Sequence, residues 1–144
     1  MFLVSACLAG FNTRYDGKNS EDKRIVDLVS SGQAIPVCPE QLGGLPTPRR
    51  PLQFMKGDGK SVLEQGDVVV YENGTDYTDC LIRGAKEILR IAGMFKIKKA
   101  IFKDGSPSCG VTYVWVSGGK QAGKGITTWL LEKNGIEVIT IDSI

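Results

Sequence analysis

Apolar and polar positions follow two different patterns along this chain. Four short runs are mainly apolar and end at Gly, Pro or polar residues, which is typical of buried strands. These runs occupy residues 2–6, 34–37, 99–102 and 136–141. Three longer segments instead repeat apolar residues at helical spacing, and they predict helices at residues 20–31, 78–92 and 126–133.

The remaining segments are dominated by turn residues. Val62-Leu63 and the apolar run at residues 68–71 flank Gly66-Asp67, a pattern that predicts a β-hairpin. Residues 41–51 and 118–125 are rich in Gly or Pro and predict loops.

Strands that alternate with helices are typical of a parallel sheet covered on both faces. The chain has 144 residues, which is enough to bury one core. It shows no internal repeat or linker. We therefore expect a single three-layer α/β domain over residues 1–144, Rossmann-like, with a mostly parallel sheet and a small β-hairpin.

Composition excludes several kinds of chemistry and several partners. The sequence has no histidine, so Ser-His-Asp and Cys-His catalysis and histidine-containing metal sites are ruled out. The net charge is +2, from 18 basic and 16 acidic residues, which gives no basis for binding bulk nucleic acid or a membrane. No apolar run approaches the ~20 residues of a membrane span, and the N-terminus does not resemble a signal peptide. We expect a cytoplasmic protein.

Three of the four cysteines occupy equivalent positions in the pattern. Cys7, Cys38 and Cys109 each follow a predicted strand and have Gly or Pro close behind, whereas Cys80 lies inside the long predicted helix. The carboxyl ends of parallel strands meet at one edge of a sheet, so the three thiols can converge there. Cys80 fits a buried, inert thiol. Strand-end cysteines are also often merely buried, and no CxxC pair of a zinc ribbon or ferredoxin is present.

If the three thiols do meet, their number decides which kind of metal site they can form. A closed structural zinc site needs four protein ligands, and there is no histidine to complete it. A cubane cluster held by three cysteines leaves one iron open, which is the arrangement of a catalytic site rather than of an electron carrier.

Several longer motifs make the chain recognisable. It resembles the thiouracil desulfurase family over nearly its whole length. The motifs that carry the resemblance are SACLAG at residues 5–10, RYDG at 14–17, PVCPEQLGGLPTPR at 36–49, SPSCG at 106–110 and the closing segment at 125–136. One departure is Thr13, where relatives often have a cysteine that is not an expected ligand.

The resemblance implies a function and a set of site residues. It implies a [4Fe–4S] cluster on Cys7, Cys38 and Cys109 and a non-redox removal of sulfur from a thiolated uracil, giving uracil and hydrogen sulfide. The hypothesis is that substrate sulfur binds the open fourth iron while water attacks the ring carbon. Glu40 and Ser106 are the expected catalytic residues. Further candidates for the substrate pocket are Tyr15, Asp16, Arg49 and Ser108.

Other interpretations stay open at this point. Glu40 is equally suited to pairing with Arg49 or Arg50, and Ser106 to capping a turn. The substrate class can be a small thiolated base or thiolated tRNA, although the latter needs a basic surface. A non-enzymatic iron–sulfur or zinc sensor, or a sulfide carrier, is a further alternative, with Glu40 completing a zinc site. A cluster protein also implies iron–sulfur assembly machinery as a partner.

Overall fold

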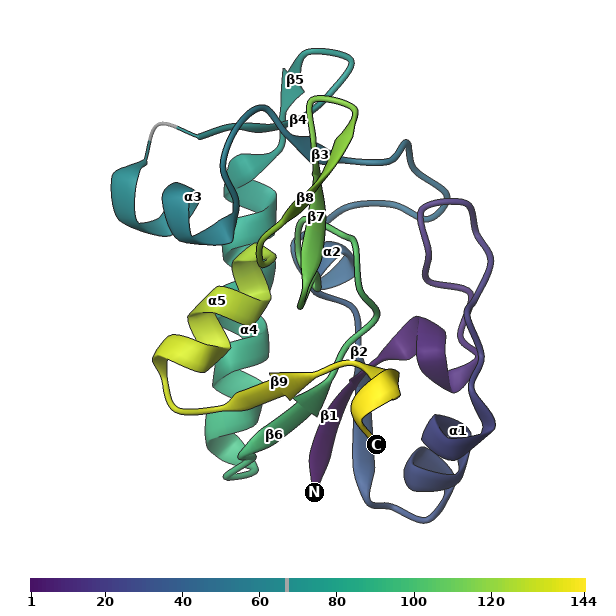
Figure 1. Ribbon diagram of the computed structural model, residues 1–144. Helices are drawn as coiled ribbons and strands as arrows, with labels where there is room; N and C mark the ends of the chain where they lie inside the picture. The colour runs from purple at the N-terminus through teal and green to yellow at the C-terminus, as the bar shows by residue number, and fades with distance from the viewer. Residues whose placement is uncertain (67) are drawn as a thin grey trace.

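The computed structural model describes residues 1–66 and 68–144. Its central sheet, sheet A, consists of parallel strands in the order β2-β1-β6-β9, as Figure 1 shows. The four strands predicted from apolar runs are therefore confirmed. Their bounds are β1 (Phe2–Ser5), β2 (Ala34–Val37), β6 (Lys99–Ile101) and β9 (Glu137–Ile139).

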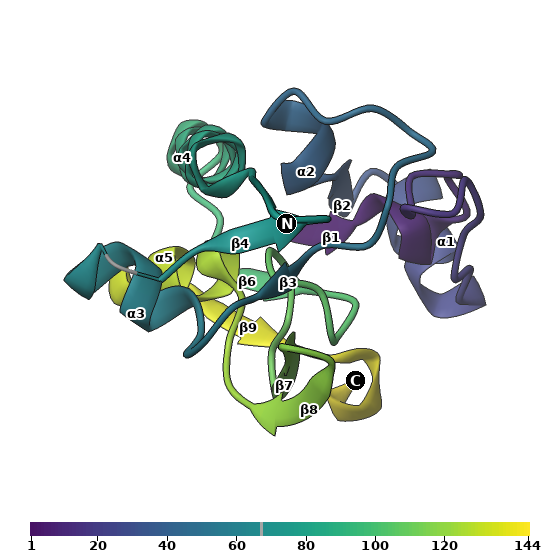
Figure 2. The same ribbon diagram turned by 90° about the horizontal axis from the view of Figure 1, so that it is seen from above.

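Helices cover both faces of sheet A. The long helix α4 (Thr78–Met94) and α5 (Ile126–Lys133) lie on one side, and α1 (Lys23–Ser30) lies on the other (Figures 1 and 2). Neighbouring residues of β1 show the division, because Leu3 packs with α4 and α5 while Val4 packs with α1. Burial on both faces explains why these strands are apolar runs without alternation. The predicted three-layer α/β architecture is confirmed.

A second sheet, sheet B, extends the fold beyond the carboxyl ends of sheet A. Its order is β5-β4-β3-β7-β8, with a core formed by residues such as Phe54, Val70 and Val114. The predicted 118–125 loop was partly wrong, because β8 pairs with β7 in an antiparallel hairpin. The strands are β3 (Gln53–Phe54), β4 (Val70–Glu72), β5 (Thr75–Asp76), β7 (Tyr113–Val116) and β8 (Gly119–Ala122).

The β-hairpin predicted around Gly66-Asp67 was wrong. Val62 and Leu63 lie in helix α3 (Gly59–Gln65), which the Asp58 side chain caps by accepting the Lys60 N–H at 3.1 Å. Gly66 ends this helix with φ of 74°, a left-handed conformation that favours glycine. Asp67 lies outside the described residues. β4 pairs instead with β3 and β5, so the small hairpins of the fold are β4–β5 and β7–β8.

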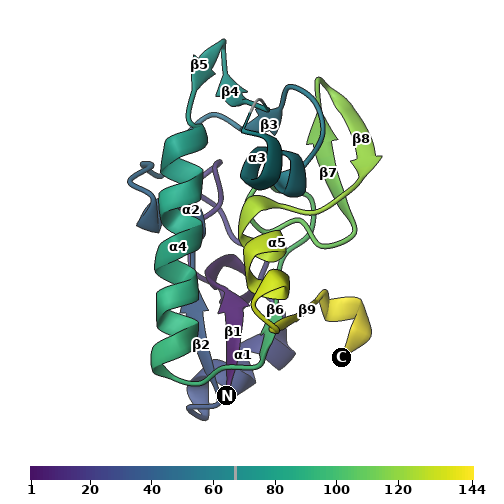
Figure 3. The ribbon, with the colours of Figure 1, turned by 90° about the vertical axis from the view of Figure 1, so that its left-hand side faces the viewer.

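Helix α4 runs alongside sheet A as far as the base of β5 and contacts both sheets (Figure 3). It also supports the short helix α2 (Pro39–Leu42), which follows β2 directly. A Cβ on Gly84 would lie 1.9 Å from the Pro39 carbonyl oxygen, so only glycine permits this close approach. The packing fixes the place of Cys38, the residue that precedes α2. Across residues 1–66 and 68–144, no helix combines the length and apolar character needed to span a membrane.

Candidate iron–sulfur site

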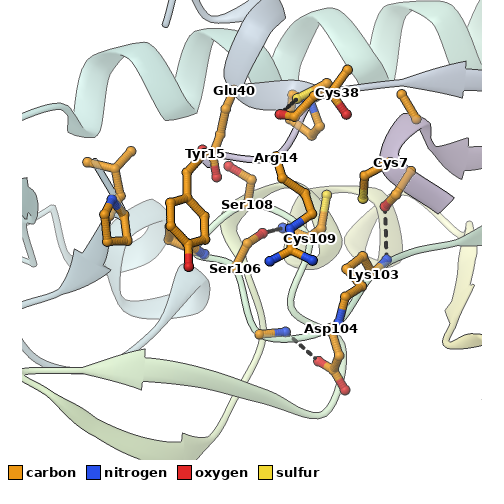
Figure 4. A pocket seen from close by; sticks show the side chains of 18 of the residues that line it. Cys7, Arg14, Tyr15, Cys38, Glu40, Lys103, Asp104, Ser106, Ser108 and Cys109 are labelled. Atoms are coloured by element: carbon orange, nitrogen blue, oxygen red, sulfur yellow. Dashed lines mark hydrogen bonds between the residues drawn. The ribbon is translucent and has the colours of Figure 1, made fainter. Parts of the chain in front are cut away.

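A cavity of about 510 Å³ lies at the carboxyl ends of β1, β2 and β6, and Cys7, Cys38 and Cys109 all line it (Figure 4). Cys7 lies in a 3₁₀ turn, η1 (Ala6–Ala9), that continues β1, while Cys38 links β2 to α2. Cys109 lies in the loop after β6. Parallel strand order thus brings together three thiols that are far apart in sequence.

Burial raises the pKa of all three thiols, and each is a free cysteine. Burial, and then the neighbouring Cys38, raise the pKa of Cys7 to about 11. Burial also raises the pKa of Cys38, and it raises the pKa of Cys109 well above its ordinary value with help from Cys38 and Cys7. Three thiolates in this cavity repel one another, and a cationic centre bound among them removes that repulsion.

Cys80 has different surroundings. It lies on α4 and packs against the core of sheet B. Its carbonyl is the group that a Cβ on Gly43 would strike, at 2.1 Å. The prediction of a buried thiol is therefore only partly confirmed, because Cys80 packs against this core but is half-buried.

Glu40 and Arg49 form a buried ion pair in the cavity wall. The Arg49 Nε–H donates to Glu40 Oε1 at 2.8 Å, and both side chains are about nine-tenths buried. The Arg49 guanidinium also donates to the carbonyl of Thr13 at 3.0 Å and to the hydroxyl of Thr47 at 2.9 Å. One of the alternative pairings expected for Glu40 is therefore present, and it holds the carboxylate in a fixed orientation beside the thiols.

Ser106 and Ser108 are held in different ways. The Ser106 Oγ accepts the Cys109 N–H at 2.7 Å, so it caps the loop that carries Cys109 and keeps its own hydroxyl proton for another acceptor. Ser108 is 1% exposed, and its hydroxyl has no hydrogen-bond partner among residues 1–66 and 68–144. Its carbonyl accepts the N–H of Thr127 at 3.0 Å, which ties the loop to α5.

The RYDG motif forms one edge of the cavity. Arg14 donates to the Asp16 carboxylate at 2.9 Å, and its guanidinium lies 6.0 Å from the centre of the Tyr15 ring. Arg14 and Tyr15 line the cavity, whereas Asp16, which was predicted for the substrate pocket, is not among its lining residues. Asp16 also accepts the Lys18 N–H at 3.0 Å, so it organises the turn and orients Arg14.

Sequence reasoning missed Asp104. Its Oδ1 accepts the N–H groups of Gly105, Val111, Thr112 and Tyr113, so one carboxylate anchors the whole loop that carries Cys109. Burial raises the pKa of Asp104, but the hydrogen bonds from the Thr112 hydroxyl and from the backbone outweigh it, and the pKa is lowered. The Asp-Gly pair before SPSCG is a turn signal that indicates such a role. Three other cavity residues were also missed or left without a role, namely Lys103, Tyr113 and Trp115.

Comparisons with known proteins show what this chain is similar to. The family model described as 2-thiouracil desulfurase matches residues 2–143. The protein YbbK of Bacillus subtilis (strain 168) is 38% identical over 143 residues, which cover 97% of this chain and 95% of YbbK. A solved structure described as the [4Fe–4S]-dependent thiouracil desulfidase TudS superposes with a TM-score of 0.85 at 38% identity, over 99% of this chain and 91% of that one. The chain therefore belongs to the 2-thiouracil desulfurase family.

Proposed function

We propose that this protein hydrolyses the carbon–sulfur bond of a thiolated uracil with a [4Fe–4S] cluster held by Cys7, Cys38 and Cys109. The observation that carries the proposal is the meeting of three free thiols in one cavity at the carboxyl end of a parallel sheet. Membership of the 2-thiouracil desulfurase family and the likeness to TudS, described as [4Fe–4S]-dependent, support the cofactor and the reaction.

The donor set fits a cluster better than a single ion. Within the described part of the chain, no three Cys, Asp or Glu side chains are spaced as ligands of one metal ion. In a cubane, each thiolate binds a different iron, so its ligands stand farther apart than the ligands of zinc. Glu40, which would complete a zinc site, is already paired with Arg49.

The residues around the thiols supply the remaining chemistry. When bound, the cluster offers one iron without a protein ligand, a Lewis acid that can hold the sulfur of the substrate. Glu40 takes the proton of the attacking water, and Arg49 keeps that carboxylate oriented. The Ser106 hydroxyl donates a hydrogen bond to the substrate. Water adds its oxygen to the ring carbon, the carbon–sulfur bond breaks, and Glu40 returns its proton to the departing sulfur, so the products are uracil and hydrogen sulfide and the carboxylate is restored.

The size of the cavity and the charge of the chain favour a small substrate. A volume of about 510 Å³ falls in the range of small-molecule sites and suits a single base. A net charge of +2 gives little attraction for tRNA. We infer that iron–sulfur assembly machinery loads the cluster, and that the four free thiols work in a reducing compartment such as the cytoplasm.

Anaerobic turnover tests this proposal. The reconstituted wild type, Cys109→Ala and the control Cys80→Ala are incubated with 2-thiouracil, and thiouracil loss is measured beside sulfide release. Wild type and Cys80→Ala are expected to release one sulfide for each thiouracil lost, while Cys109→Ala releases none. Turnover by Cys109→Ala, or none by a fully loaded wild type, would contradict the proposal.

A further inference from the structure

The β7–β8 hairpin contributes an aromatic wall to the cavity. Tyr113 and Trp115 both line it, and they alternate along β7 with Val114 and Val116, which are buried in the core of sheet B. Successive side chains of a strand point to opposite faces, so the two rings lie on the cavity side. The chemistry proposed above makes no use of them.

Trp115 is the ring of this wall that has a free surface. The Tyr113 and Trp115 rings stand perpendicular, at 87°, with their centres 6.4 Å apart. The Lys120 ammonium lies 4.1 Å from the centre of the Tyr113 ring and covers part of it. Trp115 remains 44% exposed. Tyr113 thus fixes the orientation of the indole, and the indole is left available to a ligand.

A second exposed ring lines the same cavity from another segment of the chain. Tyr15 is 42% exposed and lies among the cavity side chains that Figure 4 shows. Nucleobases stack on aromatic side chains, and two exposed rings at one cavity offer faces for such stacking. The cavity wall is therefore suited to a flat heteroaromatic ring.

We propose that Trp115 is a specificity-determining residue that stacks on the pyrimidine ring of the substrate, with Tyr113 as the residue that positions it. This inference rests on the proposed desulfuration and deepens it. The site then selects planar heteroaromatic thiocarbonyl compounds, because an aliphatic thioamide offers no ring to stack.

Steady-state kinetics with 2-thiouracil test the stacking. Trp115→Leu keeps an apolar side chain without a ring, and we expect its KM to rise about tenfold with kcat within about twofold of the wild type. Trp115→Phe restores an aromatic face and is expected to keep KM within about threefold. Tyr113→Leu removes the ring that positions Trp115 and should also raise KM. Tyr113→Phe keeps that ring and should have a KM close to that of the wild type. Iron content, measured for every variant, checks that the cluster is intact. An unchanged KM in Trp115→Leu would overturn the inference.

Fluorescence separates this inference from the proposed reaction. The sequence has two tryptophans, so Trp129→Phe leaves Trp115 as the single tryptophan, which is excited selectively over the tyrosines at the red edge of its absorption. Uracil, which has no sulfur to lose, is expected to change the Trp115 emission in a saturable titration. Failure of the wild type to release sulfide from 2-thiouracil would reject the proposed reaction, while the uracil titration still decides whether Trp115 contacts a pyrimidine. An emission unaffected by saturating uracil would reject the stacking alone.

Discussion

At the scale of single residues, the site depends on charges that are held in place by specific partners. The buried Glu40–Arg49 pair, at 2.8 Å, orients the carboxylate that we propose as the base. A buried ion pair contributes little net stability after desolvation, so the role that we assign to this pair is orientation of the carboxylate. Asp104 holds the backbone of the Cys109 loop in place, because its carboxylate accepts hydrogen bonds from four N–H groups of that loop.

Replacing Glu40 with Gln tests its role as a base. The amide oxygen of Gln still accepts the Arg49 N–H, so the cavity and the cluster should be retained, but proton acceptance is lost. We expect kcat for 2-thiouracil to fall about 100-fold or more with unchanged iron content. A variant with kcat close to that of the wild type would show that Glu40 is only a structural partner of Arg49.

The lowered pKa of Asp104 predicts that the free energy of unfolding depends on pH in the acid range. Its pKa is lowered in the folded protein, so the stabilisation is present above the ordinary carboxyl value, near pH 4, and is lost as pH falls through the lowered value. Asp104→Asn should therefore be less stable than wild type at pH 7, and the difference should shrink in acid. Urea unfolding of both proteins at several pH values measures this. A difference that stays constant with pH would contradict the assignment.

At the scale of elements, the close approach of α2 and α4 positions Cys38. A methyl group on Gly84 would strike the Pro39 carbonyl, a backbone atom that cannot turn away. We expect Gly84→Ala to destabilise the protein by about 1–3 kcal/mol and to lower its iron content, because the Cys38 segment must move. Urea unfolding and iron analysis measure the two effects.

Gly93→Ala is the matched control on the same helix. Apart from the adjoining helix backbone, no atom of the described residues lies within 4 Å of a Cβ at this position, so the substitution should stabilise α4 by about 0.5–1 kcal/mol. Equal effects of the two substitutions would contradict the account of the α2–α4 contact.

The elements also show where sequence patterns succeed and where they fail. The strands of sheet A were predictable because both of their faces are buried. The convergence of the three cysteines was predictable because each follows one of those strands. The Val62-Leu63 run was too short to distinguish a strand from a helix, and the decisive signals were the caps Asp58 and Gly66. β8 has no buried residue, so its pairing with β7 leaves no apolar pattern to detect. Asp104 acts on backbone groups, and its four contacts depend on the folded path of the loop.

At the scale of the whole molecule, α4 and α5 join the two sheets. Ile88 and Leu131 pack on sheet A, while Leu81 and Ile126 pack on sheet B. Because the same helices serve both cores, we propose that residues 1–144 form one domain and unfold in a single cooperative transition. Urea transitions followed by far-UV circular dichroism and by the fluorescence of Trp115 and Trp129 should coincide. Two separated transitions would contradict a single domain.

The central claim is that Cys7, Cys38 and Cys109 hold one [4Fe–4S] cluster with an iron that has no protein ligand. Mössbauer spectroscopy of the protein reconstituted with ⁵⁷Fe tests this claim most directly. The account predicts about four irons per chain, with one in four distinct from the others and that one alone shifted by 2-thiouracil. A protein that binds no iron, or a cluster whose irons are all unaffected by the substrate, would contradict it.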